Sequence, residues 1–129
     1  MRIEHIALWS ADIEQLKEFY MKYFGARTGP KYINPEKSFQ SYFLSFDDGV
    51  RLELMQMPGI PENQNDPVKQ NLGLIHFAVS VGSEKDVVDM TNRLRADGCR
   101  IVSEPRRTGD GYFESCILDP EGNRIEITS

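Results

Sequence analysis

Two histidines and two glutamates are the residues of this chain whose types and positions suggest chemistry. His5 and His76 are its only histidines, and each begins a stretch in which apolar residues alternate. Glu53 and Glu126 each lie in the pattern Gly-x-Arg-x-Glu, near the end of an apolar-alternating run. Imidazole nitrogens and carboxylate oxygens form a borderline ligand set that suits Zn, Ni, Co, Fe or Mn. The four side chains are therefore candidate ligands of a divalent metal ion.

Each of these residues also has a plainer interpretation. A single histidine on a strand is most often a hydrogen-bonded structural residue, and a single glutamate on a last strand is most often solvated. The four positions are far apart in the chain, so their spacing alone is a weak signal. The repetition of the pattern is what favours the metal site.

The repetition extends through most of the chain. The Gly-x-Arg-x-Glu pattern at positions 49–53 recurs 73 residues later at 122–126, and His5 is matched by His76 at an interval of 71. Features that recur in the same order at a nearly constant interval indicate an internal duplication. We predict one domain over 1–129 with two modules and a linker, at about 1–57, 74–129 and 58–73 respectively. The linker is rich in Pro, Asn, Gln and Gly, and is either a surface connection or a loop that covers a site.

The elements expected in the first module follow from periodicity and turn residues. Ser10 or Asp12 can cap a helix whose apolar residues recur every three or four positions and which ends at Gly25. Strands are expected where apolar residues alternate, with the turn Asp47-Asp48-Gly49 between the last two: 3–8, a short one near 28–33, 39–46 and 50–57.

The second module repeats this order. A helix is expected from about 83 to 96, ending near Gly98, and a glycine-bearing loop at 105–111. Strands are expected at 74–81, 100–102, 112–118 and, after the turn 119–122, at 122–127. In the last strand, alternation places Ile125 and Ile127 on one face and Glu126 on the other. The fold class is α+β, with two tandem βαβββ modules.

Composition excludes several classes of function. With 129 residues, 40% hydrophobic and 27% charged, the chain is typical of a soluble globular domain. A net charge of −5 with scattered Lys and Arg argues against a nucleic-acid partner, and no apolar run is long enough to span a membrane. Cys99 and Cys116 lack metal-type spacing and no signal peptide is visible, so we expect reduced thiols in a cytoplasmic protein.

The chain resembles the vicinal oxygen chelate superfamily over essentially its whole length. The resemblance is carried by the first-strand histidine, the ending Asp-x-Glu-Gly-Asn-Arg-Ile-Glu at 119–126 and the doubled module. That superfamily includes glyoxalase I, extradiol dioxygenases, methylmalonyl-CoA epimerase, fosfomycin-resistance thiol transferases and bleomycin-resistance proteins. The resemblance implies a cupped mixed sheet with helices on its outer face. It also implies one divalent metal ion per chain, Zn or Ni favoured with Co, Mn and Fe as further candidates, and a homodimer whose sites take two ligands from each subunit.

Within the superfamily, the order His5, Glu53, His76, Glu126 is similar to that of bacterial glyoxalase I, the lactoylglutathione lyase. The epimerase has Gln in place of Glu53, and the thiol transferases and dioxygenases need no acid there. The resemblance therefore implies a metal-dependent lyase or isomerase that transfers a proton through an enediolate. The substrate would be a small α-hydroxy- or α-oxo-carbonyl compound or its thiol adduct. Glu126 would act as the base, with Glu53 opposite it.

At two positions the residue of this chain differs from the residue of the glutathione-dependent glyoxalases. Trp9 and Met57 stand where those enzymes have Arg and Asn, which argues against glutathione as the thiol. Trp9, Met55 and Met57 share the faces of the candidate ligands and predict an apolar substrate cavity. Trp9 packing at a dimer interface explains the same pattern equally well.

Arg106 and Arg107 precede the Gly109-Asp110-Gly111 turn. From a mobile loop they could bind an anionic group of the substrate, although such a pair is more often a solvated surface feature. Two other functions stay open: thiol transfer of the fosfomycin-resistance type, and metal-free sequestration of a drug as in bleomycin-resistance proteins.

Overall fold

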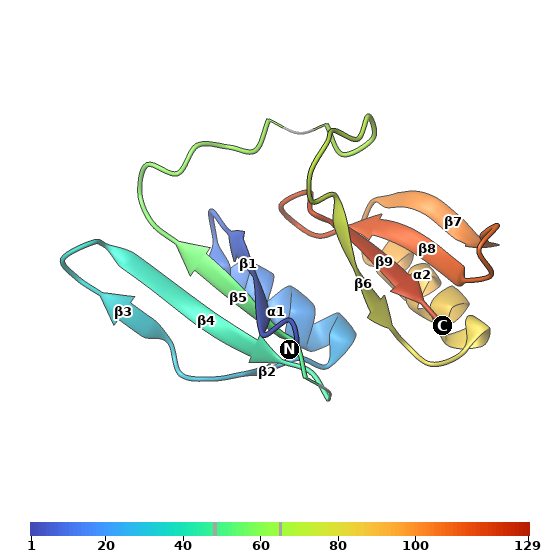
Figure 1. Cartoon of the computed structure of the whole chain (residues 1–129), viewed down its shortest axis with the longest axis horizontal. Coiled ribbons are helices and arrows are strands. Elements are labelled where there is room, and N and C mark those ends of the chain that lie inside the picture. The colour runs from blue at the N-terminus through green and yellow to red at the C-terminus, as the bar shows by residue number, and fades with distance from the viewer. Residues whose placement is uncertain (48, 65) are drawn as a thin grey trace. The chain divides into compact units, whose positions relative to one another are not determined.

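The computed structural model describes residues 1–47, 49–64 and 66–129, and these fall into two units, Met1–Asn63 and Gln64–Ser129 (Figure 1). The division lies within the predicted linker 58–73. Asp48 of the predicted turn and Asn65 of the linker are outside the described residues. Each unit contains one helix and its own sheet, so each can be described by itself.

In the first unit, helix α1 spans Ile13–Phe24 and is capped at both ends as predicted. Asp12 Oδ1 accepts hydrogen bonds from the backbone N–H groups of Glu14 and Gln15 at 3.0 and 3.1 Å. Gly25 ends the helix in the left-handed conformation with φ of 64°, which glycine adopts without steric cost. Asp12, rather than Ser10, is therefore the N-cap.

The sheet of the first unit has the order β1-β5-β4-β2, and β3 also pairs with β4. Its strands are β1 (His5–Trp9), β2 (Arg27–Thr28), β3 (Tyr32–Asn34), β4 (Phe39–Ser45) and β5 (Arg51–Gln56). The single short strand predicted near 28–33 is thus two shorter ones. β1 pairs with β5 in parallel, whereas the other pairs are antiparallel. The sheet is mixed, as the fold class requires.

Helix α1 covers one face of this sheet (Figure 1). The buried side chains of the helix and of that sheet face form the core: Ile13, Leu16, Phe19, Tyr20, Tyr23, Leu44, Leu52 and Leu54. Full burial of one Leu or Ile stabilises the fold by about 1.5–3 kcal/mol relative to exposure. Because Leu52 and Leu54 are held in this core, the side chain of Glu53 must point to the opposite face.

The second unit repeats the arrangement with the sheet order β6-β9-β8-β7. Its strands are β6 (His76–Ser80), β7 (Ile101–Arg107), β8 (Phe113–Leu118) and β9 (Arg124–Thr128), and helix α2 spans Glu84–Ala96. A reciprocal capping box joins Ser83 and Asp86 at the start of α2. Ile125 and Ile127 are fully buried, which confirms the predicted alternation of the last strand.

One prediction for this unit is wrong. Strand β7 continues to Arg107, so Pro105, Arg106 and Arg107 lie in a strand and not in the loop predicted at 105–111. Register shifts between Ile101 and Arg106 let the irregular segment stay paired with β8. Proline is tolerated here because β7 is the edge strand of its sheet.

Candidate functional site

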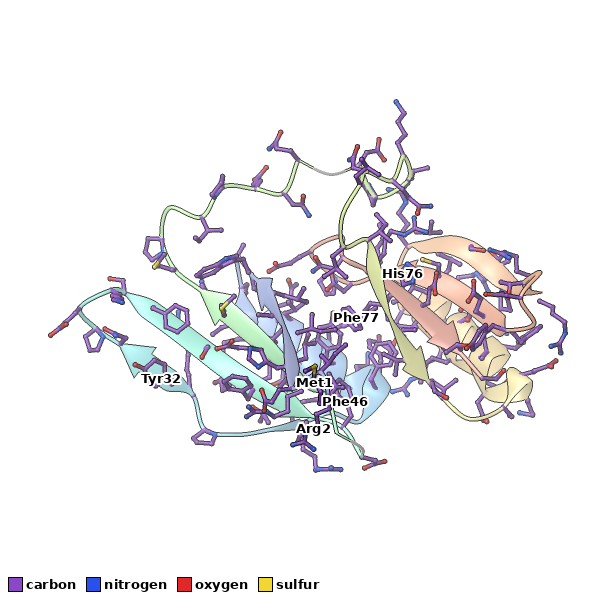
Figure 2. The ribbon with its side chains drawn as sticks, viewed as in Figure 1. Met1, Arg2, Tyr32, Phe46, His76 and Phe77 are labelled. Carbon is purple, nitrogen blue, oxygen red and sulfur yellow. The ribbon has the colours of Figure 1, made fainter. Side chains whose placement is uncertain are left out.

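In the second unit, the structure brings together His76 and Glu126, with 3.1 Å between His76 Nε2 and Glu126 Oε2. His76 lies at the start of β6 (Figure 2), and Glu126 lies in the neighbouring parallel strand β9. Glu126 pairs in register with Ala78, so His76 is its diagonal neighbour on the same face. The small side chain of Ala78 leaves the space through which the imidazole and the carboxylate approach each other. The Glu126 side chain is only 19% exposed.

The first unit contains the same pair in the same register. Glu53 of β5 pairs with Ala7 of β1, and His5 is again the diagonal neighbour on that face. His5 Nε2 lies 3.8 Å from Glu53 Oε2. The two units therefore repeat the strand register as well as the sequence pattern. In both, the alternation of buried and exposed residues places the glutamate on the same face as the histidine.

The surroundings of His5 include three groups that the sequence did not single out. His5 Nδ1 lies 2.5 Å from Glu4 Oε2, and Arg51 donates a hydrogen bond to the other carboxylate oxygen of Glu4. The Arg51 guanidinium lies over the Phe43 ring, 4.1 Å from its centroid. Hydrogen bonds to His5 and Arg51 hold the pKa of the Glu4 carboxyl below its usual value, so Glu4 stays charged.

The surroundings of Glu126 are different. Cys116 on β8 is its register partner, and Glu114, two residues earlier on the same strand face, pairs with Thr128. Burial raises the pKa of Glu114, the negative charge of Glu126 raises it further, and Arg106, whose Nη2 lies 3.8 Å from Glu114 Oε1, opposes both. A second carboxylate thus lies near the candidate ligand. Strand alternation would have indicated Glu114 only if the register of β8 against β9 had been known.

Cys99 and Cys116, both among the described residues, are not joined by a disulfide bond. Cys116 is buried, and this burial raises the pKa of its thiol. A thiol with a raised pKa is a poor nucleophile and a poor soft ligand at neutral pH. Cys116 is therefore best regarded as a structural residue.

The predicted apolar residues near His5 lie on one face of the first sheet. Trp9 pairs in register with Met55, and Trp9 is 42% exposed. The Trp9 ring meets Phe39 edge-on with 6.1 Å between centroids, and Tyr32 (Figure 2) lies at the same distance on another side of Phe39. Met57 follows the end of β5 and is half-buried. An aromatic surface thus adjoins His5 and Glu53 in this unit.

The two arginines predicted to bind an anion have separate environments. Arg107 forms an ion pair with Glu84 at the start of α2 and donates to the backbone carbonyl of Gly111 at 3.0 Å. It therefore joins the β7–β8 hairpin to the helix. Arg106 pairs with Glu114, and its Nε donates to Ser103 Oγ at 3.2 Å. Of these two arginines, only Arg106 lies on the face of the sheet that carries Glu126.

A hydrogen bond from the second sheet holds the linker near Pro67. Arg124, beside Glu126 on β9, donates a hydrogen bond from Nη1 to the backbone carbonyl of Pro67 at 2.5 Å. Asp66 Oδ1 accepts from the N–H groups of Val68 and Lys69 at 2.7 and 3.0 Å, which forms a tight turn. The segment 66–69 is therefore an ordered part of the second unit.

The His–Glu pairs suit a metal ion in both donor type and spacing. Two ligand atoms about 2.1 Å from a metal are separated by about 3.0 Å in octahedral and about 3.4 Å in tetrahedral coordination. The 3.1 Å between His76 Nε2 and Glu126 Oε2 lies in that range, and the 3.8 Å of the other pair is slightly wider. Within each unit, as far as its residues are described, no group of three or more His, Cys, Asp or Glu side chains is placed to hold an ion. Each unit thus places one imidazole and one carboxylate, two candidate donors, beside each other.

These features define a class of protein: an α+β fold of two βαβββ modules, each with a histidine and a glutamate on adjacent parallel strands. The family model described as the Glyoxalase/Bleomycin resistance protein/Dioxygenase superfamily matches residues 2–127. The chain belongs to this superfamily, which confirms the resemblance found in the sequence.

Two curated relatives are similar over nearly the whole chain. One is an uncharacterized protein, YwkD, of Bacillus subtilis (strain 168), 33% identical over 127 residues that cover 97% of this chain and 94% of the relative. The other is a trivalent organoarsenical cleaving enzyme of Bacillus sp. (strain MD1), 30% identical over 130 residues that cover 98% of this chain and 72% of that enzyme.

Solved structures share the fold at lower identity. The structure of SMU.1112c has a TM-score of 0.82 and 24% identity, and the match covers 100% of this chain and 98% of that one. Glyoxalase I of Leishmania major has a TM-score of 0.77 and 21% identity, over 100% of this chain and 86% of that one. A glyoxalase I mutant of Zea mays has a TM-score of 0.79 and 21% identity, and this chain spans 44% of it. Among the described residues, neither helix is long and apolar enough to cross a membrane.

Proposed function

We propose that this protein is a divalent-metal-dependent lyase or isomerase of the glyoxalase I type. Its substrate would be a small α-hydroxy- or α-oxo-carbonyl compound, free or as a thiol adduct. The observation that carries the proposal is the His–Glu pair that recurs in the same register in both units. We assign His5, Glu53, His76 and Glu126 as the ligands of one ion per chain, with Zn or Ni favoured and Co, Mn or Fe as alternatives.

The bound ion would supply Lewis acidity to the vicinal oxygens of the substrate. Glu126 would take the proton from one carbon and return it to the next, because one of its oxygens faces His76 and its side chain is shielded from bulk water. Glu53 is shielded to a similar degree, and in the proposed site it would serve the opposite face of the same intermediate. The enediolate that forms between the two proton transfers would be stabilised by the positive charge of the ion that these residues would hold.

Trp9, Met55 and Met57 would contact the apolar part of the substrate, since Trp9 and Met55 adjoin each other on the His5 face. Arg106 would bind an anionic group of the substrate, because it lies on the Glu126 face and its Nη2 is 3.8 Å from Glu114 Oε1. Arg107 is less suited to that role because it is engaged by Glu84 and Gly111. We further propose a cytoplasmic homodimer in which two subunits contribute to each site.

Metal content tests this proposal first. Elemental analysis of the protein as isolated, followed by calorimetric titration with Zn, Ni, Co, Mn and Fe, should give one ion per chain. His76→Ala and Glu126→Gln should reduce the affinity strongly, whereas Glu18→Gln, an exposed glutamate of α1, should not. A wild-type protein that takes up none of these ions would exclude the metal-dependent function and favour the drug-sequestering alternative.

Activity can then be tested on the hemithioacetals of methylglyoxal with several thiols. We expect turnover to require the metal ion. We do not expect glutathione to be turned over better than the other thiols. Conjugation of a thiol to fosfomycin, measured in parallel, would instead identify the thiol-transferase alternative.

The arsenical-cleaving relative supports a second candidate within the same site. That relative is 30% identical over 98% of this chain, so trivalent organoarsenicals belong in the substrate panel. Release of inorganic arsenic by the metal-loaded protein, with no turnover of hemithioacetals, would favour this candidate over the first. Cys116 is a poor arsenic ligand in this structure because its thiol is buried and has a raised pKa.

A further inference from the structure

The two candidate histidines differ in the residue that precedes each of them: Glu4 precedes His5, whereas Ile75 precedes His76. His5 Nδ1 lies 2.5 Å from Glu4 Oε2. The residue that precedes His76 is Ile75, whose side chain carries no hydrogen-bond acceptor. The duplication has therefore kept the His–Glu pair in both units, but only in the first unit does the residue that precedes the histidine carry a carboxylate.

Glu4 is held in place by contacts on both its side chain and its backbone. Arg51 donates a side-chain hydrogen bond to Glu4 Oε1, and the Arg51 backbone N–H donates to the Glu4 carbonyl at 3.1 Å. The Arg51 guanidinium packs over Phe43, and the Phe43 ring meets the His5 ring edge-on at 5.5 Å. The four side chains form a closed ring of contacts that returns to His5.

This arrangement determines which nitrogen of His5 carries the proton. A neutral imidazole has one N–H and one lone pair, and a carboxylate beside Nδ1 accepts only from an N–H. The N–H is favoured at Nδ1, which is 2.5 Å from Glu4 Oε2, over Nε2, which is 3.8 Å from Glu53 Oε2 and beyond hydrogen-bond distance, so the lone pair would lie at Nε2. Carboxylates that hold a histidine in this way orient the ring and make the other nitrogen a stronger donor to a metal.

We propose that Glu4 is a positioning residue, anchored by Arg51, which fixes His5 in the Nδ1–H form and directs its Nε2 lone pair toward the metal side. The consequence for metal binding rests on the proposed function, whereas the tautomer itself does not. His5 and His76 would thus be unequal ligands, because only His5 follows a residue whose carboxylate can accept from Nδ1–H.

Nitrogen-15 NMR of the imidazoles in metal-free full-length protein tests the tautomer. At about pH 9, well above the ordinary pKa of an imidazole, His5 should show mainly the Nδ1–H form. Glu4→Ile, which gives the first unit the residue type that precedes His76, should shift His5 toward the Nε2–H form. The signals of His76 serve as an internal control and should not change. An unchanged His5 tautomer in Glu4→Ile would overturn the proposal.

Zinc titration of the same proteins tests the consequence. Glu4→Ile should bind zinc about 10- to 100-fold more weakly than wild type, and Glu18→Gln should bind it normally. A shifted tautomer with unchanged zinc affinity would overturn the positioning role. If wild type and variants all fail to bind metal while the tautomer still shifts, the proposed function fails and the role of Glu4 in fixing the tautomer stands. The reciprocal Ile75→Glu should move His76 toward the Nδ1–H form, since Arg124 occupies in that unit the position of Arg51.

Discussion

His76 and Glu126 face each other across two parallel strands, with 3.1 Å between Nε2 and Oε2, although 49 residues separate them in the chain. The relationship between His5 and Glu53 is the same in register and slightly wider in distance. Two equivalent pairs of donors are what a four-ligand metal site needs, and the first three predictions concern what these pairs and their neighbours do.

Complementary variants should reveal whether two subunits build each site. In His5→Ala and His76→Ala homodimers, every site lacks one ligand whichever way the site is built. Suppose that each site takes one His–Glu pair from each of two subunits. A mixed dimer of one His5→Ala and one His76→Ala subunit then has one site that lacks both histidines and one site with all four ligands. Unfolding, mixing and refolding the two variants should then restore metal binding and activity to about one quarter of the wild-type level. No recovery would show that one chain provides all four ligands.

Glu126→Gln should lower turnover more than it lowers substrate binding. Loss of a general base typically reduces the rate by about 10²- to 10⁴-fold, and an amide cannot take up the proton. Glu53→Gln, the equivalent change in the first unit, is the matched control. If Glu126 is the principal base, the two variants should differ in rate when compared at saturating metal. Equal losses in both would show that the glutamates share the proton-transfer steps.

Trp9→Arg combined with Met57→Asn should increase the preference for glutathione over small neutral thiols. The changes restore a guanidinium and an amide at positions that face the candidate ligands, and a guanidinium pairs well with a carboxylate. The ratio of kcat/KM for the two hemithioacetals measures the effect. Tyr32→Arg, an exposed aromatic residue on the same unit, controls for added charge alone. A ratio that stays at the wild-type value would mean that Trp9 does not contact the thiol portion.

A buried pair of hydroxyl groups should contribute measurably to the stability of the second unit. Thr91 Oγ1 donates to the Val87 carbonyl at 2.6 Å and lies 2.7 Å from Ser115 Oγ. Because the single Thr91 proton is used, Ser115 must be the donor to Thr91. Thr91→Val leaves that donor buried without an acceptor, which should cost about 1–3 kcal/mol in urea denaturation. The double variant Thr91→Val/Ser115→Ala should recover part of this loss, and an additive loss would contradict the assignment.

Glu14 should make stability depend on pH in the acid range. Hydrogen bonds from Lys17, Lys31 and Tyr42 together lower the pKa of Glu14 from 4.5 to about 2, against the opposing effect of burial. A depressed pKa means that this stabilisation is complete above about pH 4.5 and is lost as the pH falls toward 2. The side chain is half exposed, so solvent screening keeps the contribution under about 1 kcal/mol. The difference in unfolding free energy between wild type and Glu14→Gln should therefore shrink between pH 4.5 and 2.

The sequence predicted most of the elements because their determinants are local. The cap at Asp12, the glycine at the end of α1 and the alternation around Ile125 and Ile127 all act within a few residues. The same alternation predicted that Glu53 and Glu126 lie on the sheet faces opposite the cores, where the structure also places His5 and His76.

The parts that were missed depend on contacts between distant residues. Strand β7 extends through Pro105 because pairing with β8 outweighs a local sequence typical of a loop. Glu114 lies near Glu126 only through the register of β8 against β9, and the role of Glu4 depends on the side-chain conformations of His5 and Arg51. Neither register nor side-chain conformation can be read from alternation alone.

The parallel pairing of β1 with β5, and of β6 with β9, would connect the proposed metal binding to folding. Each histidine stands at the beginning of its module and each glutamate at the end, so a pair forms only after the intervening helix and strands have assembled. An ion held by such pairs binds the folded chain and not the unfolded one, and it raises the melting temperature in proportion to the logarithm of its free concentration. A cell that limits the supply of the metal would thereby limit the lifetime of the protein as well as its activity.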